Sequence, residues 1–279
     1  MLLKVKKLLL IFSGLLFLAL LLLMAAAWPH RNAIPVLNYH QINNSAHNAL
    51  TVNTEQFEAQ MKYLTEKGYH TISPSELADA MENAAALPEN PVLITFDDGY
   101  LDNYNNAFPI LKKYNMKATI FLISDYVSVY PNYVTWDKAI EMQENQIDFE
   151  SHTLNHVELT KVSPEECLYQ LTNSKRAIEW HLQKNVSFIA YPCGSYNDEV
   201  QKLVRQAGYR GAFTVHYGMI HPGDNMYALD RVPIFGGNSH TLLRFKLRLH
   251  YAPVCIVLHD IRDRLFHVHP LLAHLVPIP

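Results

Sequence analysis

Val92-Leu93-Ile94-Thr95-Phe96-Asp97-Asp98-Gly99 begins as a short apolar run and ends in two adjacent carboxylates and a glycine. The apolar part is typical of a buried strand, and Gly99 lets the backbone turn sharply where that strand ends. Neighbouring side chains at a strand end point in different directions, so one carboxylate can bind a metal ion while the other faces a substrate. Alone, Asp-Asp-Gly is commonly only a turn, so its meaning depends on the rest of the chain.

Outward from this stretch, short apolar runs alternate with amphipathic segments. We predict strands at 34–39, 92–96, 118–123, 147–150, 186–190, 212–215 and 254–258. We predict helices at 54–67, 73–83, 103–114, 134–145, 164–183, 198–207 and 241–249. This β/α alternation indicates an α/β fold with a mostly parallel sheet, and seven or eight units favour a barrel, complete or incomplete, with helices outside. Residues 266–279 show no clear period.

The amino terminus has the pattern of a membrane-targeting segment. Lysines within residues 4–7 precede an almost uninterrupted apolar run over 8–27. The length of this run favours a retained signal anchor, whereas the small residues 25–27 suit cleavage as a signal peptide, and both remain open. We therefore expect 1–28 to be an anchor or signal peptide, and 33–279 to be an exported domain, held at the outer face of the membrane or secreted.

Composition narrows the class of protein. A chain of 279 residues suits one sizeable domain, and a formal net charge of -3 makes nucleic acid an improbable partner. Cys167, Cys193 and Cys255 are widely separated and odd in number, which argues against both a disulfide framework and a CxxC metal site. Free thiols and a single disulfide both remain open.

A histidine pair follows the predicted strand at 147–150. In His152-Thr153-Leu154-Asn155-His156 the two imidazoles are four residues apart, a spacing that places them on one face of a helical turn. With Asp98 they would give three ligands for a divalent metal ion, most simply Zn²⁺, although Co²⁺, Ni²⁺ and Fe²⁺ accept the same donors. In isolation, such a pair is often just two surface histidines.

Two further stretches follow predicted strands. His259 ends the run at 254–258 and could protonate a leaving amine, although a lone histidine there can equally be an ordinary hydrogen-bonded residue. Tyr191-Pro192-Cys193-Gly194 follows the run at 186–190 and could direct a backbone N–H at a developing oxyanion. By itself the second stretch is a Pro-Gly turn.

Taken in order, these motifs resemble a known family. The sequences TFDDG at 95–99, HTLNH at 152–156, YPCG at 191–194 and VLH at 257–259 are similar to the motif series of the polysaccharide deacetylases of carbohydrate esterase family 4, which carry the NodB-homology domain. The resemblance covers about residues 34–260, and it implies a distorted (β/α) barrel.

The resemblance also implies roles for single residues. Asp97 would be the general base and His259 the general acid, while Asp98, His152 and His156 would hold the metal ion. The N–H of Cys193 would stabilise the oxyanion, with Tyr191 and Gly194 forming the same substrate-binding motif.

The sequence departs from the family pattern at one position. The family has an arginine that pairs with the base aspartate, and the matching position here is Ala190. Arg231, in Leu229-Asp230-Arg231-Val232-Pro233, is our candidate replacement, with Asp230 or Asp260 orienting His259.

The implied activity is removal of N-acetyl groups from an N-acetylglucosamine polysaccharide. The YPCG variant and the opening VLNYH at 36–40 look most like the subgroup that acts on exported poly-N-acetylglucosamine, and peptidoglycan is the other candidate polymer. O-deacetylation of acetylated xylan and a non-catalytic carbohydrate-binding relative remain alternatives, the second because of Ala190. Aromatic residues could line a sugar groove, namely Tyr100, Tyr126, Tyr133, Trp136 and Tyr217.

Overall fold

The computed structural model describes residues 12–14, 17–18, 21–22, 25, 33–46, 48–236, 242–273 and 275–276. Most of the expected membrane segment within 1–28 lies outside these described residues. Over the ranges just given, the structure has no helix that combines the length and the apolar character needed to cross a bilayer.

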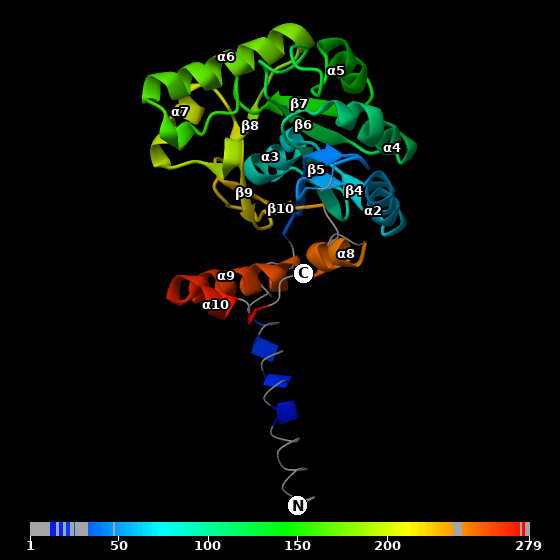
Figure 1. The fold of residues 1–279 in the computed structure, drawn as a ribbon, viewed down its shortest axis with the longest axis vertical. Helices are drawn as coiled ribbons and strands as arrows, with labels where there is room; N and C mark the ends of the chain where they lie inside the picture. Colours follow the sequence, from blue (N-terminus) through cyan, green and yellow to red (C-terminus); the bar gives the residue numbers. More distant parts are fainter. Residues whose placement is uncertain are drawn as a thin grey trace, which may run out of the picture.

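Seven parallel strands close into a barrel (Figure 1). In order around the ring they are β1 (Val36–Tyr39), β10 (Leu229–Pro233), β9 (Gly211–Tyr217), β8 (Phe188–Ala190), β7 (Ile147–Ser151), β6 (Ala118–Leu122) and β5 (Pro91–Phe96). The ring closes because β5 also pairs with β1. A short strand, β4 (His70–Thr71), pairs with β5 outside the ring. Strand β2 (Gln41–Ile42) pairs with β3 (Thr51–Val52). The predicted (β/α) barrel is confirmed, and a register shift between β10 and β9 is one of its distortions.

Most of the helices surround the strands, and the last helices of the chain lie below the barrel (Figure 1). The helices are α2 (Thr54–Glu66), α3 (Pro74–Asn83), the π-helical η2 (Asn103–Ala107), α4 (Phe108–Lys113), α5 (Trp136–Gln143), η3 (Leu159–Lys161), α6 (Pro164–Leu182), η4 (Pro192–Gly194), α7 (Asp198–Gln206), α8 (Leu242–His250), α9 (Ala252–Val268) and α10 (Pro270–Ala273). Local sequence explains their starts. Ser73 and Glu76 form a capping box on α3, with Pro74 in its first turn, and Asn53 caps α2.

Apolar side chains fill the end of the barrel at which the strands begin. Alternate residues of the strands, such as Val36, Leu93 and Phe188, pack with Leu77 of α3 in one buried cluster. Arg210, just before β9, donates hydrogen bonds to Asp79 and Glu82 of α3 and so helps to hold this helix in place. The polar side chains of the barrel interior are therefore collected toward the other end, where the strands finish.

Two sequence predictions about the last strands are wrong. Residues 254–258 are not a strand but part of α9, since a short apolar run fits a buried helix as well as a strand. The seventh place in the barrel is taken by β10, which we did not predict because Asp230 and Arg231 interrupt its apolar pattern. Arg231 can nevertheless lie inside the barrel, because its charge is compensated there by a carboxylate described below.

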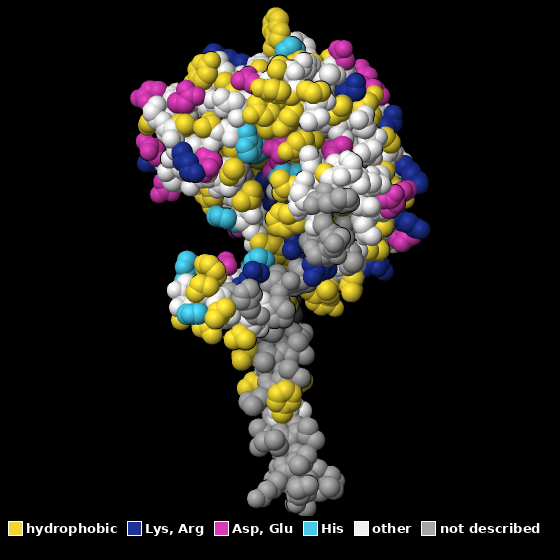
Figure 2. All heavy atoms as spheres, viewed as in Figure 1, with side chains coloured by type: hydrophobic (Ala, Val, Ile, Leu, Met, Phe, Trp, Pro, Cys, Tyr) yellow, Lys and Arg dark blue, Asp and Glu magenta, His cyan; other side chains and the backbone are white. Residues whose placement is uncertain are grey.

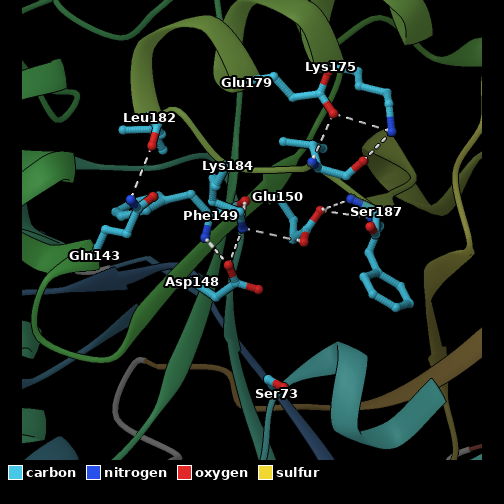
Figure 3. Close-up of polar contacts among 12 residues, drawn as sticks. Ser73, Gln143, Asp148, Phe149, Glu150, Lys175, Glu179, Leu182, Lys184 and Ser187 are labelled. Atoms are coloured by element: carbon cyan, nitrogen blue, oxygen red, sulfur yellow. Dashed lines mark hydrogen bonds and ion pairs between the residues drawn. The ribbon is translucent and has the colours of Figure 1, made fainter. Parts of the chain in front are cut away.

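A network of charged side chains braces the entry to β8 (Figure 3). Glu150 of β7 is fully buried, and its Oε2 accepts the N–H groups of Ser187 at 2.8 Å and Phe188 at 2.7 Å. Lys184 lies 3.5 Å from Oε1 of Glu150 and also pairs with Asp148. The network ties β8 to β7, and so fixes the Ala190 carbonyl that orients one of the histidines of the site.

Glu150 should make the stability of the fold depend on pH. Burial raises the pKa of Glu150 well above the usual carboxyl range, against the opposing effect of Lys184. The unfolded chain therefore loses this proton at lower pH than the folded chain, so the free energy of unfolding should fall as pH rises from weakly acidic values. Glu150→Gln should flatten this slope by up to about 1.4 kcal/mol per pH unit.

Urea unfolding between about pH 5 and pH 8 would measure this slope. Glu179→Gln is the matched control, because it makes the same chemical change in the same network at a side chain that is 31% exposed. An unchanged slope in Glu150→Gln would show that the carboxyl is ionised in the folded protein throughout this range.

Candidate active site

Three candidate metal ligands converge where β5 and β7 end. Oδ1 of Asp98 lies 3.5 Å from Nε2 of His152 and 3.5 Å from Nε2 of His156. The candidate ligand atoms of these three residues all lie within 4.8 Å of one another. One carboxylate oxygen and two imidazole nitrogens at this separation can share a single divalent ion.

The histidine pair meets in a way that we did not predict. His152 and His156 lie in a turn after β7 and not on a helical turn, and their ring centroids are 4.8 Å apart. The turn places Thr153 at φ 68° and His156 at φ 64°, and Asp98 has φ 73°. Such left-handed backbone conformations are unfavourable for residues other than glycine and concentrate at functional sites.

The protonation states in the site suit a metal ion. Burial lowers the pKa of His152 to about 3, so its ring is neutral, and its Nδ1 contacts the Ala190 carbonyl at 2.8 Å. If Nδ1 carries the proton and donates it to that carbonyl, Nε2 presents a lone pair to the ion. Burial also lowers the pKa of His156, and it raises the pKa of Asp98 to about 6. The donor set therefore fits zinc, cobalt, nickel or ferrous iron.

Asp97 is paired with an arginine from the far side of the barrel. Nη1 and Nη2 of Arg231 each donate to one oxygen of Asp97 at 2.7 Å, and both side chains are buried. Nε of Arg231 donates to the Thr214 carbonyl at 2.7 Å, which fixes the guanidinium. Arg231 thus lies where we expected the missing arginine. The matching position, Ala190, is itself buried in the cluster that fills the barrel.

This pairing keeps Asp97 ionised. Burial alone would raise the pKa of Asp97, but the charge and hydrogen bonds of Arg231 outweigh burial and hold that pKa well below its usual range. The two neighbouring carboxyls therefore have opposite shifts, lowered in Asp97 and raised in Asp98. Such a divergence is common where two carboxyls divide the work of a catalytic site.

His40 is a site residue that we did not predict. Its Nε2 lies 3.8 Å from Oδ2 of Asp97, and its side chain is 16% exposed, whereas Asp97 is only 2% exposed. His40 directly follows β1, just as Asp97 directly follows β5, and these strands are neighbours in register. The rule that reactive groups gather at the carboxyl ends of parallel strands could have identified it.

His259 and Asp230 lie apart from the metal ligands. His259 is on α9, where its ring stacks on Tyr217 with centroids 4.8 Å apart. Both His259 and Asp230 line a cavity of about 650 Å³ between α9 and the β9–β10 region, together with Asp260, and none of the metal ligands lines it. On this side a notch separates the barrel from the C-terminal helices (Figure 2).

The contacts of Asp230 are consistent with this separation. Its Oδ1 accepts a hydrogen bond from Thr214 Oγ1 at 2.9 Å and lies 4.0 Å from Nδ1 of His216. Because successive side chains of a strand point to opposite faces, Arg231 enters the barrel and Asp230 leaves it. Asp230 and Asp260, our two candidates for orienting His259, line the same cavity as His259, so that role stays a prediction.

The YPCG turn directly follows Ala190, whose carbonyl contacts His152. Tyr191 is buried, its hydroxyl donates to the Tyr227 carbonyl at 2.9 Å, and its ring stacks on Tyr196. Gly194 has φ +67°, and a side chain there would collide with Val215. Cys193 has φ 54° and is exposed overall, but its thiol is partly desolvated, which raises the thiol pKa. The three cysteines within the described ranges are all free thiols.

Comparison with known proteins places these features in context. The polysaccharide deacetylase family model matches residues 84–212. YxkH of Bacillus subtilis, a protein assigned to the polysaccharide deacetylases, is 39% identical over 206 residues, which are 74% of this chain and 73% of YxkH. The poly-β-1,6-N-acetyl-D-glucosamine N-deacetylase of Staphylococcus aureus is 27% identical over 231 residues, 73% of this chain and 79% of that protein.

Solved structures agree with the sequence relatives. The deacetylase PplD of Streptococcus pyogenes, solved in complex with acetate, superimposes with a TM-score of 0.70 at 31% identity. The match covers 73% of this chain and 92% of that protein.

Proposed function

The chain belongs to the polysaccharide deacetylase family. We propose that it removes N-acetyl groups from an exported N-acetylglucosamine polysaccharide, and that this polymer is poly-β-1,6-N-acetylglucosamine. The observation that carries the proposal is the grouping of Asp98, His152 and His156 beside the ionised, buried Asp97. The polymer is proposed from the substrate that the name of the Staphylococcus aureus relative gives.

Asp98, His152 and His156 would hold the metal ion. When bound, a divalent ion supplies Lewis-acid chemistry, which polarises an acetyl carbonyl and makes a water molecule more acidic. The protein must add a group that takes a proton from the attacking water. Asp97 fits, because Arg231 keeps it ionised and because it adjoins the ligand Asp98.

The second proton transfer requires a donor. The water oxygen bonds to the acetyl carbon, the C–N bond breaks, and the departing nitrogen must gain a proton because amines leave poorly otherwise. We assign this donation to Nε2 of His40, which lies 3.8 Å from Asp97 and is open to solvent in part. We prefer His40 to His259 because His259 lines the 650 Å³ cavity, whose lining includes neither Asp97 nor the candidate metal ligands. A backbone N–H of the YPCG turn, with Cys193 the candidate, would face the oxyanion.

We also propose that the protein acts outside the cytoplasmic membrane. A lysine-led apolar segment within 1–28 would direct export, and an exported polysaccharide would then meet the catalytic domain on the same side of the membrane. The membrane would be a partner through that segment if it is retained.

Acetate release tests the proposed function. The metal-loaded protein should release acetate from β-1,6-linked N-acetylglucosamine oligomers, and release should fall to background after chelation and return when metal is added back. Acetylated xylan is the comparison substrate. Release from xylan alone would replace N-deacetylation by O-deacetylation, and release from neither polymer would favour a carbohydrate-binding protein without activity.

A further inference from the structure

A tyrosine-rich loop, residues 124–134 between β6 and α5, lies beside the metal site. Its first three residues donate hydrogen bonds to three consecutive carbonyls of the turn that carries the two histidine ligands. These bonds run from Ser124 N–H to Thr153 at 3.2 Å, from Asp125 N–H to Leu154 at 2.9 Å and from the Tyr126 hydroxyl to Asn155 at 3.4 Å. The amino-terminal end of the loop is therefore held against the turn that carries His152 and His156.

The other end of the loop is fixed to the turn that carries Asp98. The N–H of Val134 donates to the Gly99 carbonyl at 3.0 Å, and the Asn132 carbonyl accepts the N–H of Leu101 at 2.8 Å. Both ends are thus bonded to backbone next to metal ligands. The side chains on this loop consequently keep a set position relative to the reaction centre.

Four tyrosines form a continuous cluster from a metal ligand to the surface. Tyr100 and Tyr133 stack with centroids 5.1 Å apart, Tyr126 and Tyr133 meet edge to face at 4.9 Å, and Tyr126 and Tyr130 do so at 4.8 Å. The Tyr100 hydroxyl is within hydrogen-bonding reach of Asp98, and Tyr130 is 51% exposed. We call Tyr100, Tyr126, Tyr130 and Tyr133 the tyrosine cluster.

We infer that the tyrosine cluster binds the sugar ring next to the one being deacetylated, an inference that rests on the proposed function. Aromatic faces attract the C–H-rich faces of pyranose rings, while phenol hydroxyls bond to sugar hydroxyls, and a neutral polymer needs no charged partner. Tyr130 supplies the exposed face. Because the loop is tied to both metal-ligand turns, a ring resting there would continue the chain that places its neighbour at the metal.

The inference predicts that the protein distinguishes a polymer from a single sugar. Tyr130→Ala should raise KM for N-acetylglucosamine oligomers by about 3- to 10-fold. It should leave kcat, the activity on N-acetylglucosamine itself and the hydrolysis of a small activated acetate ester unchanged. Tyr169→Ala is the matched control, because Tyr169 is 57% exposed on α6, outside the tyrosine cluster.

Calorimetry on the metal-free protein gives a second readout that does not require turnover. Oligomers should bind the wild-type protein and the Tyr169→Ala variant equally, and bind Tyr130→Ala more weakly by the same factor as the KM change. Equal oligomer KM and equal binding in Tyr130→Ala and wild type would overturn the inference. If the wild-type protein releases no acetate, the proposed function fails, and binding alone then decides. Weaker oligomer binding in Tyr130→Ala supports a sugar site at the tyrosine cluster, whereas equal or absent binding rejects that site.

Discussion

His40→Gln is expected to lower kcat on N-acetylglucosamine oligomers by roughly 10²- to 10⁴-fold, the usual contribution of a general acid. The glutamine keeps the polar size of the side chain but cannot pass a proton to a leaving amine. An activated ester has a leaving group that departs without protonation, so its hydrolysis should be lowered far less. The ratio of the two losses, measured at saturating substrate, is the quantity that identifies a proton donor.

His259→Gln is the control for this experiment, because it makes the same change in the histidine that the sequence motif singles out. It should stay within a few-fold of wild type on both substrates, since His259 stacks on Tyr217 and lines a cavity that contains none of the metal ligands. A selective loss of amide hydrolysis in His259→Gln, with His40→Gln active, would reverse our assignment and imply that α9 approaches the metal during the reaction.

The comparison of these two histidines shows what the sequence can and cannot reveal. The strand that ends in Asp97 and the motif around His152 are local patterns, and the rule for parallel strands is enough to bring them together. His259 is preceded by an apolar run that suits either a strand or a helix, and only packing decides between them. Local pattern therefore brought the three candidate metal ligands together, but it placed His259 after a strand, whereas the structure has His259 on α9.

Arg231 shows the opposite case. A charged residue inside a short strand lowers the apolar score of that strand, so β10 was not predicted, although Arg231 itself was a candidate partner for Asp97. The compensating charge comes from β5, far away in the sequence, and no local pattern contains it. The small side chain at Ala190 was the only sequence signal that an arginine had to come from elsewhere.

Arg231→Met is expected to destabilise the protein by about 3–5 kcal/mol at neutral pH, because it leaves the Asp97 carboxylate buried without its partner. The wild-type pKa of Asp97 is lowered by folding, so its contribution is present above the ordinary carboxyl pKa and is lost as pH falls. The loss in Arg231→Met should therefore shrink in acid.

Arg210→Met is the control for the Arg231 experiment. It removes an arginine that is 29% exposed from its two ion pairs, with Asp79 and Glu82, and should cost only about 1 kcal/mol. Adding Asp97→Asn to Arg231→Met should recover part of the lost stability, because the uncompensated charge is then gone, while activity stays low. Urea unfolding of the three variants and wild type at two pH values measures these differences. An Arg231→Met protein as stable as wild type at neutral pH would mean that Asp97 does not depend on this guanidinium for its charge.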